Sequence, residues 1–466
     1  MLIARYLSRG RTILVLALVL SAPTVAASPA TAVRPVLVKG GFAPDPERSA
    51  ERARPGDLAA AGRSVFFTAW DAEHGRELWF SDGRPGDARL VADIYPGVSS
   101  GAPACLRAVR SAVYFNAADP DHGRELWQSD GTALGTRLVN QFGAGPASVS
   151  RDPCVVGNLG RTLLVKTTYP RSGALWASDG SPEDTELLLS GDVQSLVTTG
   201  SRALALVHEG IGVTKLWTTD GTPEGTVPVL TLANPVTGGS ALNLTAAGER
   251  IYLEVSDAAH GAELWTTDGT ASGTRLVSDL RPGPAGSEPD RLTPAGARLY
   301  FTADDGVRGR ELWVTDGTAE GTRRVADLRP GPASSEPRPL GVDASGTLYF
   351  TADDGVRGRE LWRTDGSTRG TRLVGDLRRG AEGSDPSGFA SLAGRVYFTA
   401  DDGRRGRELW VVDRPRGGAR LVADLVPGPR SSDPTSLTVA GRRLFFVAAD
   451  AAGTFGLWRI RHPRWW

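Results

Sequence analysis

Apolar and aromatic residues fall in short continuous runs, and turns rich in Asp, Gly and Pro separate these runs throughout most of the chain. No helical period interrupts this pattern, so the elements it predicts are short β-strands. One stretch shows it well, with predicted strands at Glu288–Thr293, Arg298–Ala303, Arg310–Val314 and Thr322–Leu328. The central runs do not alternate with polar residues, which indicates an antiparallel sheet of four strands that is covered on both faces.

This four-strand pattern recurs with a period near 48 residues, and one tryptophan marks the third predicted strand of every copy. The recurring tryptophans are Trp79, Trp127, Trp176, Trp217, Trp265, Trp313, Trp362, Trp410 and Trp458. A fixed period of this size is typical of repeat architectures. Repeated four-stranded sheets that are covered on both faces predict an all-β fold, a single closed β-propeller in which each tryptophan is structural and lies between blades.

The two ends of the repeat region complement each other. The last copy supplies three strands between Thr435 and Arg461, and the segment Arg34–Lys39 resembles the fourth strand seen at Ala419–Asp424. An N-terminal strand that completes the C-terminal blade would remove two sheet edges, and it gives nine blades. Eight blades is the alternative, because Trp176 and Trp217 are only 41 residues apart and their copies depart from the consensus.

The N-terminal segment 1–32 has the features of a signal peptide. Arg5, Arg9 and Arg11 precede the apolar run Ile13–Leu20, and small residues follow it. This run is far shorter than the roughly 20 residues of a membrane span, and no other stretch is apolar enough to be one. We therefore expect an extracytoplasmic protein, periplasmic or secreted, in which the propeller occupies 33–461 and a short tail 462–466.

Composition argues against some partners but does not decide whether the two cysteines form a disulfide. The chain has 53 Lys and Arg against 53 Asp and Glu, so bulk charge gives no reason to expect nucleic acid. Cys105 and Cys154 lie at the same position of consecutive copies. They form either a disulfide between neighbouring blades or two separate thiols. Nothing points to an oligomer, and we expect a monomer.

The run Glu311–Thr322, with the sequence ELWVTDGTAEGT, resembles the defining pattern of the bacterial ELWxxDGT-repeat proteins. This resemblance covers roughly residues 58–458 and implies an exported, propeller-like protein without implying an activity. Ala303, Asp305, Gly309 and Trp313 also have the spacing of the tryptophan-docking pattern of quinoprotein propellers, with Arg308 where that pattern has Thr. That looser likeness implies a propeller and no quinone site.

Candidate metal ligands fit a structural role better than a binding role. His74, His122 and His260 occupy one turn position that Arg fills in other copies. The acidic turns, such as Asp304-Asp305-Gly306, contain the residues that tight turns need. They lack the alternating spacing of a calcium loop, so calcium is possible but unsupported, and no metal site or cofactor is predicted.

One surface of the predicted propeller is a candidate binding site. The loops that enter the innermost strand and the loops between strands two and three should share a face. The candidate residues are Glu288, Glu336, Asp385 and Asp433 around the channel mouth, with Arg310, Arg359 and Arg407 further out beside Arg308, Arg357 and Arg405. Loops on a rigid scaffold often carry binding functions. The alternative is a solvated set of ion pairs with little individual effect.

No catalytic motif occurs in the chain, so no catalytic residue is predicted. We expect an exported, non-enzymatic β-propeller that acts as a binding scaffold for a protein or a carbohydrate through its loop-rich face. Two alternatives remain. One is an extracytoplasmic hydrolase or quinone-type oxidoreductase with a site at the channel mouth, and the other is a structural surface or matrix protein.

Overall fold

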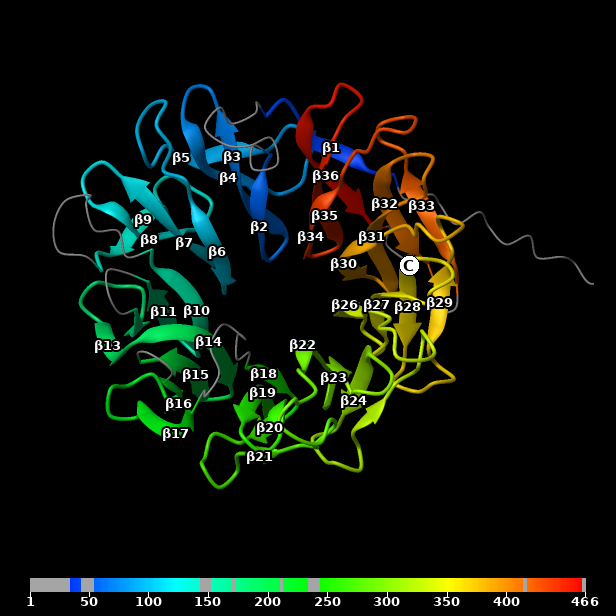
Figure 1. The fold of residues 1–466 in the computed structure, drawn as a ribbon. Coiled ribbons are helices and arrows are strands. Elements are labelled where there is room, and N and C mark those ends of the chain that lie inside the picture. Colours follow the sequence, from blue (N-terminus) through cyan, green and yellow to red (C-terminus); the bar gives the residue numbers. More distant parts are fainter. Residues whose placement is uncertain are drawn as a thin grey trace, which may run out of the picture. The chain divides into compact units, whose positions relative to one another are not determined.

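The fold of the repeat region is a ring of nine sheets (Figure 1). The computed structural model describes residues 34–42, 54–142, 152–168, 173–209, 213–233, 244–413 and 417–462. Within these ranges every regular element is a β-strand, and no helix has the length and apolarity to cross a membrane. The predicted signal peptide and residues 463–466 of the predicted tail lie outside the described residues.

Each sheet contains four antiparallel strands, and we number the sheets as blades 1 to 9 in chain order. Blades 1 to 3 contain β2 (Gly56–Ala61), β3 (Ser64–Asp71), β4 (Gly75–Ser81) and β5 (Arg89–Ala92); β6 (Ala104–Val109), β7 (Ala112–Asp119), β8 (Gly123–Ser129) and β9 (Arg137–Asn140); β10 (Cys154–Leu159), β11 (Thr162–Thr167), β12 (Ala174–Ser178) and β13 (Thr185–Ser190). Blades 4 to 6 contain β14 (Asp192–Thr199), β15 (Arg202–His208), β16 (Val213–Thr219) and β17 (Val227–Ala233); β18 (Thr245–Ala247), β19 (Arg250–Asp257), β20 (Gly261–Thr267) and β21 (Arg275–Leu276); β22 (Asp290–Ala295), β23 (Arg298–Asp304), β24 (Arg310–Thr315) and β25 (Arg323–Arg324). Blades 7 to 9 contain β26 (Arg338–Val342), β27 (Leu348–Asp353), β28 (Arg359–Thr364) and β29 (Arg372–Gly375); β30 (Ser387–Leu392), β31 (Arg395–Asp401), β32 (Arg407–Val412) and β33 (Ala419–Ala423); β34 (Thr435–Ala440), β35 (Arg443–Ala449), β36 (Phe455–Arg461) and the N-terminal β1 (Val36–Lys39).

The ring closes through the two ends of the repeat region, as the sequence predicts. Blade 9 has the strand order β1-β36-β35-β34, so its outermost strand comes from the N-terminal part of the chain. Val36 pairs with Arg459 and Lys39 pairs with Leu457 in antiparallel register. The prediction of nine blades is therefore confirmed, and the eight-blade alternative is wrong.

The short interval between Trp176 and Trp217 has a local explanation that preserves the blade count. β13 ends at Ser190 and β14 begins at Asp192, so Gly191 alone joins blades 3 and 4. Other junctions use a longer loop, such as the Pro-Gly-Pro segment before Ser335. A shortened connection therefore accounts for the missing residues, and both copies keep four strands.

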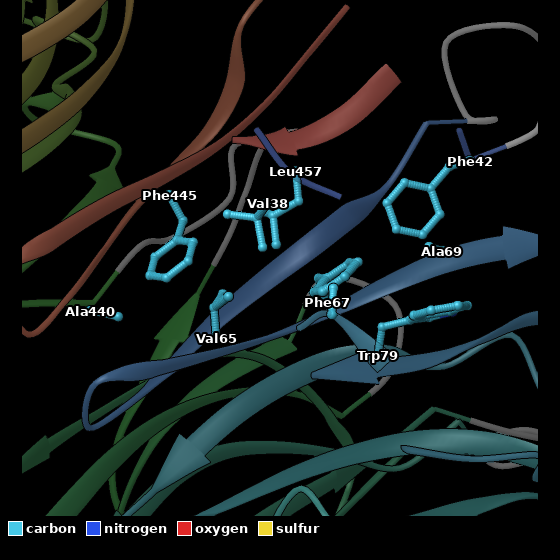
Figure 2. Packing of buried hydrophobic residues seen from close by; sticks show 10 residues of the cluster. Val38, Phe42, Val65, Phe67, Ala69, Trp79, Ala440, Phe445 and Leu457 are labelled. Carbon is cyan, nitrogen blue, oxygen red and sulfur yellow. The ribbon is translucent and has the colours of Figure 1, made fainter. Parts of the chain in front are cut away.

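The core is divided into nine apolar clusters, each of which combines side chains from two neighbouring blades. Every repeat tryptophan joins one of these clusters and packs against the preceding blade. Figure 2 shows the cluster that joins blade 9 to blade 1, where Val38 and Leu457 lie near Phe67 and Trp79. The repeated tryptophans thus have the structural role that their spacing predicts.

Two details of the predicted strands are wrong. In blade 6 the first strand begins at Asp290 rather than Glu288, because Glu288 adopts a φ of 49°, which is outside the extended region. The fourth strand of that blade contains only Arg323 and Arg324 instead of seven residues. In the corresponding strand of blade 7 a bulge shifts the register after Leu373, and this irregularity is invisible in the apolar pattern.

The turn between strands three and four explains the recurring Asp-Gly-Thr sequence. In blade 6 the Asp316 carboxylate accepts hydrogen bonds from the backbone N and the Oγ1 of Thr318, at 3.0 and 2.7 Å. A Cβ atom on Gly321 would come within 2.1 Å of the same carboxylate, so a side chain there would require this carboxylate to move. The acidic side chain of this turn therefore organises its own loop.

Candidate functional site

The loops between strands two and three and the loops that connect blades lie on one face of the ring, which we call the loop-rich face. In blade 6 the backbone N of Arg310, at the end of one loop, donates to Ser334 Oγ of the next connecting loop at 2.9 Å. The backbone N of Asp304 donates to the Ser287 carbonyl at 2.9 Å on the same side. These contacts hold both kinds of loop against the strands and leave little freedom for rearrangement.

The predicted acidic residues occupy one equivalent position on this face, directly before the proline that precedes the innermost strand. All four have positive φ angles, 49° for Glu288, 47° for Glu336, 45° for Asp385 and 53° for Asp433. Few non-glycine residues adopt this conformation. The side chains of Glu288 and Asp385 are 69% and 66% exposed, so their carboxylates are accessible to a ligand.

The predicted arginines lie closer to these acids than the sequence indicates. Arg310 Nη1 donates to the Glu288 carbonyl at 2.6 Å, and Arg310 Nη2 lies 3.0 Å from the Glu288 carboxylate. Arg359 Nη1 donates to the Glu336 carbonyl at 2.7 Å. Arg407 makes the corresponding bond to the carbonyl of Asp385 at 2.8 Å.

Each of these arginines therefore supports the loop that carries the acid of its own blade. Arg310, Arg359 and Arg407 lie on strand three of each blade, and their guanidinium groups reach over the strands to the positive-φ carbonyls. Their side chains are engaged within the protein, and the neighbouring carboxylates are the more accessible groups.

A second set of ion pairs lies in the loops between strands two and three. Arg357 Nη1 is 2.5 Å from the Asp354 carboxylate, and Arg405 Nη1 is 2.6 Å from that of Asp402. Burial tends to raise the pKa of Asp402, but backbone N–H groups and Arg405 outweigh it and lower the pKa, which keeps the carboxylate ionised. These pairs stabilise the loops in their observed conformation.

Histidine takes the place of this arginine in three blades. His122 Nδ1 lies 2.8 Å from the Asp119 carboxylate, and His74 and His260 contact Asp71 and Asp257 in the same way. The hydrogen bond to the aspartate raises the pKa of each histidine. No group of three or more His, Cys, Asp or Glu side chains that could hold a metal ion occurs in the described ranges.

A row of buried glutamates behind these loops was missed by the sequence analysis. The Glu of the Glu-Leu-Trp sequence is 0% exposed in Glu311 and Glu408. Glu311 accepts a hydrogen bond from Ser335 Oγ at 2.6 Å and another from the Ser335 backbone N at 3.2 Å. We call this contact the glutamate latch, because it ties strand three of one blade to the loop that leads into the next.

The latch recurs with a constant spacing of 24 residues. It joins Glu263 to Ser287, Glu360 to Ser384 and Glu408 to Ser432 through the serine hydroxyl, and Glu77 to Gly101 through the backbone N–H alone. Burial raises the pKa of Glu77 to about 8 and the pKa values of Glu311 and Glu408 to about 7. The spacing between the Glu and the Ser is the sequence signal that could have revealed the latch.

Blades 3 and 9, which lack this glutamate, have a different connection to their neighbour. Blade 3 has Ala174 at this position, and the single residue Gly191 replaces the loop that a latch would hold. Blade 9 has Gly456, where a Cβ atom would lie 2.8 Å from both Leu37 Cδ1 and the Lys39 carbonyl of β1. The departures from the repeat therefore follow the geometry of the junctions.

The two cysteines lie on the innermost strands of adjacent blades. A disulfide joins Cys105 in β6 to Cys154 in β10, with their Cα atoms 5.7 Å apart. This separation lies within the usual range for a disulfide, and it removes the objection that the two positions are too distant. The bond links blades 2 and 3 beside the channel.

Glu254 on β19 departs from its equivalents in other blades. Thr302, Thr351 and Thr399 fill this position in blades 6 to 8. Burial, assisted by the charges of Asp290 and Glu288, raises the pKa of Glu254 to about 7. A carboxyl with such a pKa can exchange a proton near neutrality, but no hydrogen-bonded base or nucleophile accompanies it in the described residues.

Two polar cavities open on the loop-rich face. One of about 610 Å³ lies between blades 7 and 8, where Arg378 and Arg379 meet Asp402 and Arg404. Another of about 360 Å³ lies where the innermost strands of blades 9, 1 and 2 begin. Both volumes are in the range of small-ligand sites.

Comparison with known proteins gives little information about function. No protein-family model matches the chain, and no curated protein sequence matches it. Among solved structures, a puromycin hydrolase mutant is 17% identical with a TM-score of 0.38, over 75% of this chain and 59% of that one. A Mycobacterium tuberculosis puromycin-hydrolyzing peptidase is 13% identical with a TM-score of 0.42, over 85% and 58%. The β-propeller domain of the Trilobed protease from Pyrococcus furiosus is 12% identical with a TM-score of 0.39, over 79% and 97%.

The chain thus covers less than two thirds of the length of the two puromycin-hydrolysing enzymes. The TM-scores are too low for any of these likenesses to carry an argument about activity.

Proposed function

We propose that this protein is a non-enzymatic binding scaffold that holds a protein or carbohydrate ligand on its loop-rich face. The observation that carries this proposal is the repetition of one accessible acidic position on loops with a fixed conformation. Glu288, Glu336 and Asp385 present it in three consecutive blades, at the same place relative to the innermost strand. A surface that is already ordered loses little conformational entropy on binding.

The glutamate latches and the arginine contacts provide this order. The loop between blades 6 and 7, for example, is held by the buried carboxylate of Glu311 at Ser335 and by Arg359 at the Glu336 carbonyl. Neighbouring blades therefore present similar groups at a regular separation. A ligand with repeating units can contact several blades at once and gain affinity from this multiplicity.

We also propose that the protein is exported and monomeric, and that it belongs with the ELWxxDGT-repeat proteins. The predicted signal peptide and the repeated Glu-Leu-Trp and Asp-Gly-Thr sequences support these assignments. The mass of the protein recovered from an exporting host tests removal of residues 1–32, and sedimentation of that protein tests the oligomeric state.

The binding proposal is tested with the full chain from such a host, by affinity capture of extracytoplasmic proteins and by a glycan array. One variant neutralises the inner acids through Glu288→Gln, Glu336→Gln, Asp385→Asn and Asp433→Asn. A matched variant, Glu224→Gln with Glu320→Gln, neutralises exposed acids in turns on the opposite face.

We expect the first variant to lose the captured ligand and the second to keep it. Equal binding by both variants would remove the loop-rich face from the proposal. Turnover of a substrate by the unmodified chain would favour an enzyme instead.

A further inference from the structure

The cavity of about 360 Å³ at the channel mouth differs in charge from equivalent positions around the ring. It lies where β34, β2 and β6 begin, and Figure 1 shows β34 and β2 as neighbours beside the centre of the ring. Its walls include the charged residues Arg54, Arg76 and Asp57 and the hydroxyl-bearing residues Thr68, Thr435 and Ser436.

Arg54 reverses the charge of the repeated acidic position. It directly precedes Pro55, as Glu288 precedes Pro289 and Asp433 precedes Pro434. In blade 6 the arginine of strand three, Arg310, meets the acid Glu288. In blade 1 the equivalent Arg76 meets Arg54 instead, and its Nη1 lies 3.5 Å from the Arg54 carbonyl. Two arginines therefore line the cavity, where blade 6 has one arginine and one acid at the same two positions.

Both arginines are held in place by surrounding groups. Arg54 lies over the ring of Phe455, 4.6 Å from its centroid, and its Nη2 is 3.2 Å from the Asp433 carboxylate. Its buried Nε makes no hydrogen bond to a described residue. Arg76 is only 4% exposed, and its Nη1 lies 3.4 Å from Thr68 Oγ1. Positioned guanidinium groups of this kind bind carboxylates with little rearrangement.

The remaining groups favour a sugar over a peptide. Three hydroxyls and the Asp57 carboxylate can exchange hydrogen bonds with several ligand hydroxyls, whereas the wall offers no large apolar surface for a C-terminal side chain. The nearby carboxylates of Asp57 and Asp433 disfavour a dianion such as phosphate. A ligand with one carboxylate on a ring of hydroxyls satisfies all of these groups.

We propose that this cavity binds a uronic-acid residue of an acidic glycan, with its carboxylate on Arg54 and Arg76 and its hydroxyls on Asp57, Thr68 and Ser436. The inference rests on the proposed binding function, since it names a ligand class for one part of the same face. All five of these residues lie within the described part of the chain.

The test measures binding of methyl glucuronide to the full chain by ligand-observed NMR titration. Methyl glucoside, which lacks the carboxylate, is the matched neutral probe, and N-acetylglycylglycine is the peptide carboxylate probe. We expect the glucuronide to bind at least about tenfold more tightly than either, a difference of roughly 1.4 kcal/mol.

Arg54→Glu gives blade 1 an acid at the position where other blades have one, and we expect it to weaken glucuronide binding by at least about tenfold. Arg54→Gln removes the charge without reversing it, and it provides the same test if Arg54→Glu does not fold. Glu320→Gln changes an exposed residue in a turn on the opposite face and should leave glucuronide binding unchanged.

Equal binding of glucuronide and glucoside, or glucuronide binding that survives both Arg54 variants, would overturn the inference. Preference for the peptide probe would assign the cavity to a chain terminus instead. If glucuronide does not bind while a captured ligand still depends on the inner acids, this inference fails and the scaffold proposal stands. If no ligand depends on the loop-rich face, the scaffold proposal fails as well.

Discussion

Phe42 provides a direct test of how the ring closes. This residue lies three positions after the end of β1, is only 5% exposed, and packs in the cluster that joins blade 9 to blade 1. Its ring meets Phe67 and Trp79 edge to face, with centroids 5.8 and 5.4 Å away. Because β1 has only four residues, this contact should supply much of the attachment of the strand.

Substitution of Phe42 by alanine removes this contact and leaves a cavity in a well-packed interface. Such substitutions destabilise proteins by about 3–5 kcal/mol. Domains typically have about 5–15 kcal/mol of total stability, so the expected loss is a large fraction of the whole. The free energy of unfolding of the full chain in denaturant gives this quantity.

Phe142 offers a matched control in another blade. It is 6% exposed and packs edge to face on Trp176 with a centroid distance of 5.6 Å, so Phe142→Ala removes a similar contact. The disulfide between Cys105 and Cys154 also crosses that junction, whereas hydrogen bonds hold β1 to β36. Only the Phe42 variant should therefore release a whole strand.

Hydrogen exchange of the β36 amides distinguishes the two cases. We expect faster exchange near Leu457 and Arg459 in Phe42→Ala and unchanged exchange there in Phe142→Ala, because local opening follows local stability. Slow β36 exchange in both variants would refute the idea that Phe42 holds the closing strand. Fast exchange in both would mean that the ring opens as one unit.

Three further predictions concern the latches, the pH dependence and the disulfide. Glu311→Ala should lower the free energy of unfolding by about 1–3 kcal/mol in denaturant titration, because the buried donors of Ser335 lose their acceptor. Glu311→Gln should lower the free energy of unfolding by less. An effect no larger than that of the exposed Glu320→Ala would exclude a latch. Burial raises the pKa values of Glu77, Glu311 and Glu408 from 4.5 to about 7–8 in the folded protein. The folded state therefore binds these protons more tightly than the unfolded state does. The resulting stabilisation is complete below pH 4.5 and is lost as the pH rises through about 7–8. The melting temperature should therefore be higher near about pH 5 than near about pH 9, and replacing these glutamates by glutamine should flatten the difference; a melting temperature that rises over this interval would contradict it. Cys105→Ser with Cys154→Ser should reduce the free energy of unfolding by about 2–4 kcal/mol, and the stability of this variant should not change with reductant. If reductant also leaves the stability of the unmodified chain unchanged, the disulfide adds no stability.

The sequence predicts the architecture well because the same pattern of strands and turns, which is ambiguous in one copy, recurs in every copy of the repeat. A single Leu-Tyr-Phe run could belong to many folds, but nine tryptophans with a period near 48 residues and a missing last strand indicate a closed ring. The fine geometry was not predictable in the same way. The positive φ of Glu288 and the two-residue strand at Arg323 are backbone details that the pattern of apolar and polar residues does not encode.

The candidate site was predicted in part. The sequence identified the acidic residues before the prolines and the arginines of strand three, but it did not reveal that these arginines bind the carbonyls of the acids. It also missed the buried carboxylates. The glutamate before each Leu-Trp pair resembles an ordinary polar residue, and its buried role becomes clear only when its hydrogen-bond partner 24 residues later is considered. The charge reversal at Arg54 is also readable in the sequence, since Arg54 precedes Pro55 as Glu288 precedes Pro289, but the sequence analysis did not use it.

The composite blade has a consequence for how the chain assembles during synthesis. β1 is the first of the described strands to be made, and its partner β36 is the last of them, more than 400 residues later. At about 5–20 residues per second, the leading strand waits roughly 20–85 s with an open edge. Eight blades can form in order during this time, while the first strand stays unpaired until the ribosome has finished the last. A truncated product therefore lacks the partner of its own leading strand, and this unpaired edge marks the molecule as incomplete.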